Sequence, residues 1–197
     1  MFAKSKTVFI RSLLYVLFSI AIFNSSALAA IQTSAEQIKA GYVYRFTQFV
    51  EWPKKPEVES RIAHDDSNFM LCVFDDISFY NILSPLKEYK VGHKNIFLTN
   101  TTSVNEITDC NVLYVSEIHS NKINSILKSV GNKPILTIGS APDFARTGGI
   151  IGFVAINNKI KFEINSEIVK RSNLKLSAKL YETALKIYKN EQRGVID

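Results

Sequence analysis

Four short apolar runs, each separated from the next by a polar or helical segment, constrain the fold of this chain more than any other feature. They are FMLCVF (69–74), NIFLT (95–99), NVLYVS (111–116) and PILTIG (134–139). The first run is apolar throughout, which is typical of a buried strand, and the other three are also predicted to be strands. Helical segments are predicted between them, from Asp76 to about Tyr89 and over 120–130, where Gly131 would end the helix. Strands that alternate with helices predict a single α/β domain with a mostly parallel central sheet flanked by helices.

The pattern changes after residue 149, where a C-terminal antiparallel hairpin is predicted. Two apolar-rich segments, 150–156 and 159–164, are separated only by Asn157-Asn158. Asparagine tolerates the positive φ of a type I′ turn, so this pair suits a two-residue hairpin connection. Terminal helices should follow the hairpin, a short one from about Ser166 and a longer amphipathic one over roughly 176–192.

An aromatic-rich stretch, IKAGYVYRFTQFVEWP (38–53), precedes the first strand. Two overlapping capping boxes in TSAEQ predict a helix that starts near Ala35, and Pro53 should end it at Trp52. At 100° per residue, one side of this helix forms an apolar stripe that should pack on the sheet. The stripe comprises Ile38, Tyr42, Val43, Phe46, Phe49 and Val50. Tyr44 and Trp52 lie off this stripe, so they are the candidates for exposed aromatic contacts with another molecule.

The first 29 residues have the three parts of a secretory signal peptide. Lys4, Lys6 and Arg11 form a cationic start, residues 12–23 form an apolar core, and Ala27-x-Ala29 offers a cleavage site. The alternative is an uncleaved anchor, but the apolar core is well short of the roughly 20 residues that cross a bilayer. We therefore expect residues 1–29 to be removed and 30–197 to form the exported domain.

Removal of the leader also lowers the charge. The formal net charge of +6 falls to +3, because the leader carries three cations and no acid. A charge this small indicates neither nucleic-acid binding nor a membrane-coating surface.

Cys72 and Cys110 are the two cysteines of the chain. An even pair in an exported protein is typical of a disulfide, although two buried thiols remain the alternative.

No pattern in the sequence indicates catalysis, a cofactor or a metal. His64, His93 and His119 lack zinc-ligand spacing, and each is expected at the surface. The glycines of RTGGIIG (146–152) precede a strand and lack the lysine of a phosphate loop, so they should form a turn. The serine of GSAPDFA (139–145) lacks the flanking glycines of a hydrolase elbow.

Asp75 and Asp76 follow the first strand and leave two interpretations open. Paired carboxylates at the end of a parallel strand could hold a magnesium ion. Alternatively, Asp76 caps the helix that begins at Ile77, which is the interpretation that we favour.

Two long motifs in this order resemble the YfiR-like periplasmic family. The first is IKAGYVYRFTQFVEWP, and the second comprises Ile151-Gly152-Phe153, Phe162-Glu163-Ile164-Asn165 and Leu174-Lys175-Leu176-Ser177-Ala178-Lys179-Leu180. The resemblance covers nearly all of residues 30–197, and Cys72 and Cys110 match the family's first disulfide. A second cysteine pair that family members can carry near the glycine turn is missing here.

The resemblance implies a non-enzymatic signalling regulator in the periplasm of a Gram-negative bacterium. Its partner would be the periplasmic part of a membrane-anchored diguanylate cyclase or sensor kinase, and its action would lower cyclic-di-GMP and biofilm formation. It implies a partner surface that includes Phe153, Glu163 and Ile168, and the domain could act as a homodimer. Two alternatives are a periplasmic small-molecule-binding sensor with a pocket near Asp75 and Gly139, and an envelope enzyme.

Overall fold

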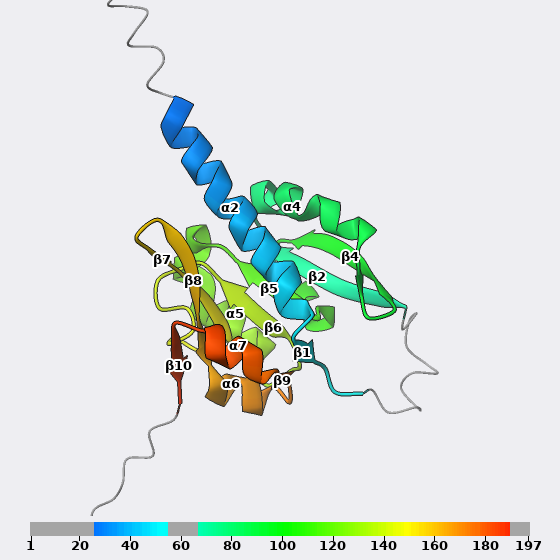
Figure 1. Cartoon of the computed structure of the whole chain (residues 1–197). Coiled ribbons are helices and arrows are strands. Elements are labelled where there is room, and N and C mark those ends of the chain that lie inside the picture. The colour runs from blue at the N-terminus through cyan, green and yellow to red at the C-terminus, as the bar shows by residue number, and fades with distance from the viewer. Residues whose placement is uncertain (1–25, 55–66, 190–197) are drawn as a thin grey trace, which may run out of the picture. The chain divides into compact units, whose positions relative to one another are not determined.

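The computed structural model describes residues 26–54 and 67–189, with side chains from Ala35 onward (Figure 1). The chain divides into two compact units, residues 1–37 and 38–197. Helix α2 (Ser26–Thr47) begins in the first unit and ends in the second, and the sheets and all other described helices belong to the second unit. The predicted leader falls largely outside the described residues, so its removal stays a prediction. No helix within 26–54 or 67–189 is long and apolar enough to cross a membrane.

An eight-stranded sheet forms the centre of the second unit. Its order is β10-β8-β7-β6-β5-β2-β4-β3. The five strands from β4 to β7 in that order are parallel, whereas β7–β8 and β3–β4 are antiparallel and β10 runs parallel to β8. The strands are β2 (Asn68–Phe74), β3 (Lys90–Val91), β4 (Lys94–Thr101), β5 (Val112–Val115), β6 (Leu136–Gly139), β7 (Ile151–Ile156), β8 (Lys159–Asn165) and β10 (Lys186–Tyr188). The predicted α/β class with a mostly parallel sheet is confirmed.

Short helices and a small second sheet complete the unit (Figure 1). The α-helices are α4 (Ile77–Leu83), α5 (Ile123–Val130), α6 (Ser166–Arg171) and α7 (Ala178–Thr183), and the 3₁₀ turns are η1 (Ser84–Glu88), η2 (Glu106–Asp109) and η3 (Glu117–Lys122). Strands β1 (Val50–Glu51) and β9 (Lys175–Leu176) pair antiparallel and form the second sheet. The predicted hairpin turn is also present, because Asn157 and Asn158 both have positive φ, at 49° and 58°.

Strand alternation divides the core into two clusters, one on each face of the sheet. Leu71 and Val73 of β2 point into a first cluster that includes Val43 and Phe46 of α2. Cys72 of β2 points into a second cluster, with residues of α5 and with Phe144. Strands β5 and β6 are buried on both faces and β2 is nearly so, which explains why they appear in the sequence as largely apolar runs. Strand β4 differs, because Phe97 on its outer side is 53% exposed.

The side chain of Phe144 explains two of the glycines near the predicted turn. The ring is buried, and a Cβ atom would lie 2.3 Å from it at Gly139 and 2.0 Å from it at Gly149. Gly152 is similarly tight, since a Cβ there would lie 3.0 Å from the backbone nitrogen of Ala145. These glycines make room for protein atoms, consistent with the turn interpretation of RTGGIIG.

Helix α2 differs from the prediction at both ends. It begins at Ser26 rather than near Ala35, in keeping with the strong helix propensity of alanine and leucine in SALAA. It ends at Thr47, five residues before Trp52, because the chain unwinds to pair β1 with β9. Ile38, predicted in the core, is 46% exposed, since the buried face of α2 follows Ala40, Val43 and Phe46.

The predicted helix over 176–192 is also wrong. Helix α7 stops at Thr183, and Ala184 adopts an extended conformation (φ −65°, ψ 140°). The Leu185 amide then donates to the Phe162 carbonyl at 2.8 Å, and the next residues form β10 beside β8. Pairing with a distant strand therefore overrides the local helical periodicity.

The histidines divide between surface and interior. His93 is exposed as predicted, and His64 lies outside the described residues. His119 is buried, at 8% exposure, which contradicts the predicted surface position. Its ring stands edge-on to Phe74 at 5.3 Å, so the side chain packs against the second cluster.

Candidate functional site at the end of helix α2

Three segments that are far apart in the sequence meet where α2 ends. The β1–β9 ladder pairs Val50 with Leu176 and Glu51 with Lys175. Just beyond it, the Ser177 amide donates to the Phe49 carbonyl at 2.9 Å. The segment after α2 is thus fixed against the segment that enters α7.

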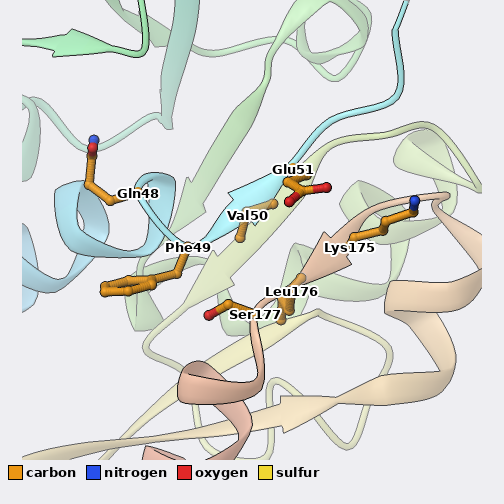
Figure 2. Close-up of a pocket in the computed structure, with 7 residues that line it drawn as sticks. All are labelled: Gln48, Phe49, Val50, Glu51, Lys175, Leu176 and Ser177. Atoms are coloured by element: carbon orange, nitrogen blue, oxygen red, sulfur yellow. The ribbon is translucent and has the colours of Figure 1, made fainter.

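A hollow of about 340 Å³ lies at this junction (Figure 2). Its lining comprises Gln48, Phe49, Val50, Glu51, Lys175, Leu176 and Ser177. Glu51 and Lys175 lie at one end of the hollow, and the Phe49 ring lies at the other (Figure 2). The lining therefore offers an apolar end, an amide, and one charge of each sign.

Ser177 is the least satisfied of these side chains. It occupies the N-cap position of α7, yet its hydroxyl makes no capping hydrogen bond. The oxygen is buried and has no hydrogen-bond partner in the described parts of the chain. A buried hydroxyl without a partner costs free energy, about 1–3 kcal/mol, unless a bound group satisfies it. Ser177 is therefore the lining residue whose buried hydroxyl would gain a missing hydrogen bond from a bound group.

The hollow in Figure 2 has features that suit binding, since an apolar ring lies beside polar and charged side chains. Its lining contains no histidine or cysteine beside the serine. Within residues 26–54 and 67–189, no group of three or more His, Cys, Asp or Glu side chains could hold a metal ion. Gln48, Lys175 and Ser177 were not predicted as site residues, and the one available signal was the position of the last two inside the Leu-Lys-Leu-Ser motif.

The three predicted interface residues lie near one another but not on one surface. Phe153 of β7 is buried, and its ring stacks on Phe46 at 5.9 Å, so it can influence a partner only through the core. Ile168 of α6 is half-buried against the first cluster. Glu163 lies on the opposite face of β8 from its buried neighbours Phe162 and Ile164.

Glu163 is tied to the last strand of the sheet. Its Oε2 accepts a hydrogen bond from the Tyr188 hydroxyl at 3.0 Å. Burial raises the pKa of the Tyr188 phenol, and the hydrogen bond to Glu163 shifts this pKa in the same direction. Strand β10 therefore covers part of the β8 edge that the hairpin pattern alone would leave open.

Tyr44 and Trp52, predicted as exposed, are both half-buried against the first cluster. The Tyr44 ring packs against Tyr89 at 5.2 Å, and its hydroxyl donates to the Lys90 carbonyl at 3.4 Å. Trp52 packs edge-on against Phe69 at 5.0 Å, and its indole N–H donates to the Asn111 carbonyl at 3.2 Å. Both rings have structural partners, and contact with another molecule stays a prediction.

The strand ends near Asp75 and Gly139 show a helix cap, and a ligand pocket there stays a prediction. Asp76 Oδ1 accepts from the Phe79 amide at 2.9 Å, so the capping interpretation is confirmed. Nε2 of His119 lies 2.9 Å from the Asp75 carbonyl oxygen, and the Phe144 ring fills the space beside Gly139.

The predicted disulfide is present, and Cys72 and Cys110 are joined with their Cα atoms 5.9 Å apart.

A family model described as YfiR/HmsC-like, for a domain designated DUF4154, matches residues 36–184. The chain belongs to the YfiR/HmsC-like family. The match contains the whole described sheet except β10, together with the hollow at the end of α2.

Two solved structures are similar to this YfiR/HmsC-like chain over part of its length. One is the ABC domain from Streptococcus pneumoniae in complex with L-Trp, at 14% identity and a TM-score of 0.43, covering 60% of this chain and 56% of that one. The other is a conserved domain protein from Vibrio cholerae O1 biovar El Tor, at 9% identity and 0.47, covering 66% and 58%. The chain thus spans a little over half the length of each. No curated protein matches it significantly.

Proposed function

We propose that this protein is a periplasmic signalling regulator that binds and inhibits the sensor part of a membrane-anchored diguanylate cyclase. The observation that carries the proposal is the match to the YfiR/HmsC-like family over residues 36–184. The predicted leader and the Cys72–Cys110 disulfide, which suits an oxidising compartment, support export to the periplasm.

A protein of this kind transmits a signal by binding one state of its partner more tightly than another. Inhibition requires that the domain, alone or as a homodimer, favours the inactive state of the cyclase sensor. The accessible residues of the proposed surface are Glu163 and Ile168, both half-buried, whereas Phe153 is buried in the core.

Cellular cyclic-di-GMP is the measurement that tests this function. Deletion of the gene in its native host should raise cyclic-di-GMP and biofilm, and the wild-type gene on a plasmid should restore both. Complementation with Ile168→Asp should fail, because a charge at a half-buried apolar contact opposes docking. Lys170→Asp, on the exposed side of α6, is the matched control and should complement. Unchanged cyclic-di-GMP in the deletion strain would contradict the proposal.

Export is tested separately. Cell fractionation and N-terminal sequencing should find a periplasmic chain that begins at Ala30. A chain that retains Met1 in the membrane fraction would show that the leader is an anchor.

A second candidate function is a small-molecule-binding sensor without a cyclase partner. The hollow in Figure 2 favours it, because the buried Ser177 hydroxyl there lacks a partner within the described residues. Deletion would then leave cyclic-di-GMP unchanged, while the purified protein would still bind a ligand.

A further inference from the structure

A larger hollow, of about 500 Å³, lies between the last turns of α2, strand β8 and helix α7. Its lining comprises Tyr42, Arg45, Phe46, Phe49, Lys161, Phe162, Lys179, Leu180 and Thr183. It shares only Phe49 with the hollow in Figure 2. We call it the aromatic–cationic hollow. Its volume falls within the range of small-ligand sites, about 300–1,000 Å³.

Packed aromatic rings form one wall of the aromatic–cationic hollow. The Phe46 and Phe162 rings meet edge-to-face with centroids 4.9 Å apart, and Tyr42 contacts them at 5.7 and 5.9 Å respectively. Phe46 and Phe162 are both buried in the first cluster. Because these rings hold one another in place, the apolar wall exists before any ligand arrives, and ordering it costs a ligand little.

Two cationic side chains line the same hollow from different elements. Arg45 comes from the last turn of α2, and Lys179 comes from α7. The Lys179 ammonium lies 5.9 Å from the centre of the Phe49 ring. Both side chains are exposed, and across the described ranges neither makes an ion pair with a carboxylate.

The charged residues that line the aromatic–cationic hollow are all cationic. Its lining includes Arg45, Lys161 and Lys179 but no aspartate or glutamate. Positive charges lower the free energy of an anion placed between them. The guanidinium group of arginine also suits planar acids such as carboxylates. A flat apolar body beside that acid would pack on the aromatic wall.

We propose that the aromatic–cationic hollow binds a small organic anion that carries a flat apolar body, such as an aromatic carboxylate or sulfonate. Arg45 and Lys179 bind the acid group, and Tyr42, Phe46 and Phe162 contact the apolar body. This site goes beyond the proposed regulator function, since it belongs to the isolated domain and needs no partner. If this site does not bind an anion, the cyclase proposal is unaffected. If the protein does not regulate a cyclase, the binding proposal is likewise unaffected.

The test is a binding titration of the purified, disulfide-linked domain with 1-anilinonaphthalene-8-sulfonate, followed by the probe's fluorescence. The matched probe is N-phenyl-1-naphthylamine, which has the same ring system without the sulfonate. We expect saturable binding of one sulfonate probe per domain, at least tenfold tighter than the neutral probe. Added salt should weaken the binding of the sulfonate probe only, because it screens exposed charges.

Substitutions locate the binding. Arg45→Gln and Lys179→Gln should each weaken the binding of the sulfonate probe about fivefold, in line with an exposed charge-assisted contact. Both residues are exposed, so the variants should fold. Thr183→Trp, which places a large ring at the edge of the hollow, should block binding without removing charge. Lys170→Gln, on α6 and outside the lining, is the control and should bind as wild type does.

Three results would overturn the proposal. The first is the absence of saturable binding, and the second is equal affinity for the charged and neutral probes. The third is weakened binding in Lys175→Gln with unchanged binding in Arg45→Gln, which would place the anion in the hollow of Figure 2 instead.

Discussion

Substitution of Gly149 by alanine tests the packing around Phe144. The Phe144 ring lies between two glycines, and a Cβ at Gly149 would come within 2.0 Å of Cε1 and 2.3 Å of Cδ1. The other edge of the ring faces Gly139, where a Cβ would lie 2.3 Å from Cδ2. An ordinary contact begins near 3.4 Å, so the ring would have to move by about 1.4 Å, and Gly139 leaves it no room to do so.

The expected cost follows from the burial of this ring. Forcing an extra methyl group into a packed core costs about 1–3 kcal/mol, and the fully buried position of Phe144 places the cost of Gly149→Ala at about 3 kcal/mol. For a domain of this size, that loss corresponds to a fall in melting temperature of about 6–12 °C. Backbone strain does not contribute, because Gly149 does not have a positive φ.

Urea denaturation measures the effect, and the single tryptophan of the chain supplies the signal. Trp52 is anchored to Asn111 and packs on Phe69, so its fluorescence should change when the sheet unfolds. Gly41→Ala is the matched control, since it makes the same chemical change in the middle of α2, where nothing lies within 4 Å of the new Cβ. It should stabilise the protein by about 0.5–1 kcal/mol, because alanine loses less backbone entropy in a helix.

A double-mutant cycle distinguishes this contact from a general loss of stability. Phe144→Leu shortens the side chain, so it should partly rescue Gly149→Ala. The double variant should be more stable than the sum of the two single effects by about 1 kcal/mol or more, the coupling expected for residues in contact. Additive effects, or a Gly149→Ala variant as stable as wild type, would refute the packing argument.

Three further perturbations have defined outcomes. Replacing Cys72 and Cys110 by alanine should lower the free energy of unfolding by about 4 kcal/mol, since the disulfide closes a loop with a sequence separation of 38; in urea denaturation, a loss under about 1 kcal/mol would contradict this. In the same assay, Asp76→Ala should lower the free energy of unfolding by about 1 kcal/mol, because the α4 cap is lost. Asp76→Asn should retain most of this stability, since asparagine also caps helices. Because the pKa of Tyr188 is raised above its ordinary value of 10.0, its neutral phenol favours the folded state, and this stability is present below pH 10 and lost as pH rises further. Ultraviolet titration of wild type against Tyr188→Phe should show the Tyr188 midpoint above 10; a midpoint below 10 would contradict it.

The central strands could be predicted from sequence because their environment is uniform. Strand β5 is buried along its whole length, and Val112 and Leu113 point into different clusters. Each residue of such a strand must be apolar, so the signal is local and continuous. The hairpin turn was equally local, because Asn157 and Asn158 supply the positive φ that the turn requires.

The ends of the two amphipathic helices could not be predicted, because their termination depends on distant partners. Residues 48–52 have helical periodicity, but Val50 and Glu51 instead form a strand that pairs antiparallel with β9. Val50 pairs with Leu176 and Glu51 pairs with Lys175, both more than a hundred positions along the chain. Lys186, which was predicted to be helical, likewise lies in a strand and pairs with Glu163 of β8. Periodicity within a short window carries no information on such pairing, and tertiary context overrides it.

The mispredicted ends of α2 and α7 lie beside the two hollows, and the early end of α2 helps to form them. Had α2 continued to Trp52, Phe49 would have stayed on its apolar stripe and packed on the sheet with Phe46. Instead the chain unwinds after Thr47, and Phe49 is left half-buried between the two hollows, with Lys179 over its ring. Departure from the locally preferred structure is expected at binding sites, where local preference and function compete. We therefore expect residues 48–51, which depart from the helical pattern, to contact a bound ligand.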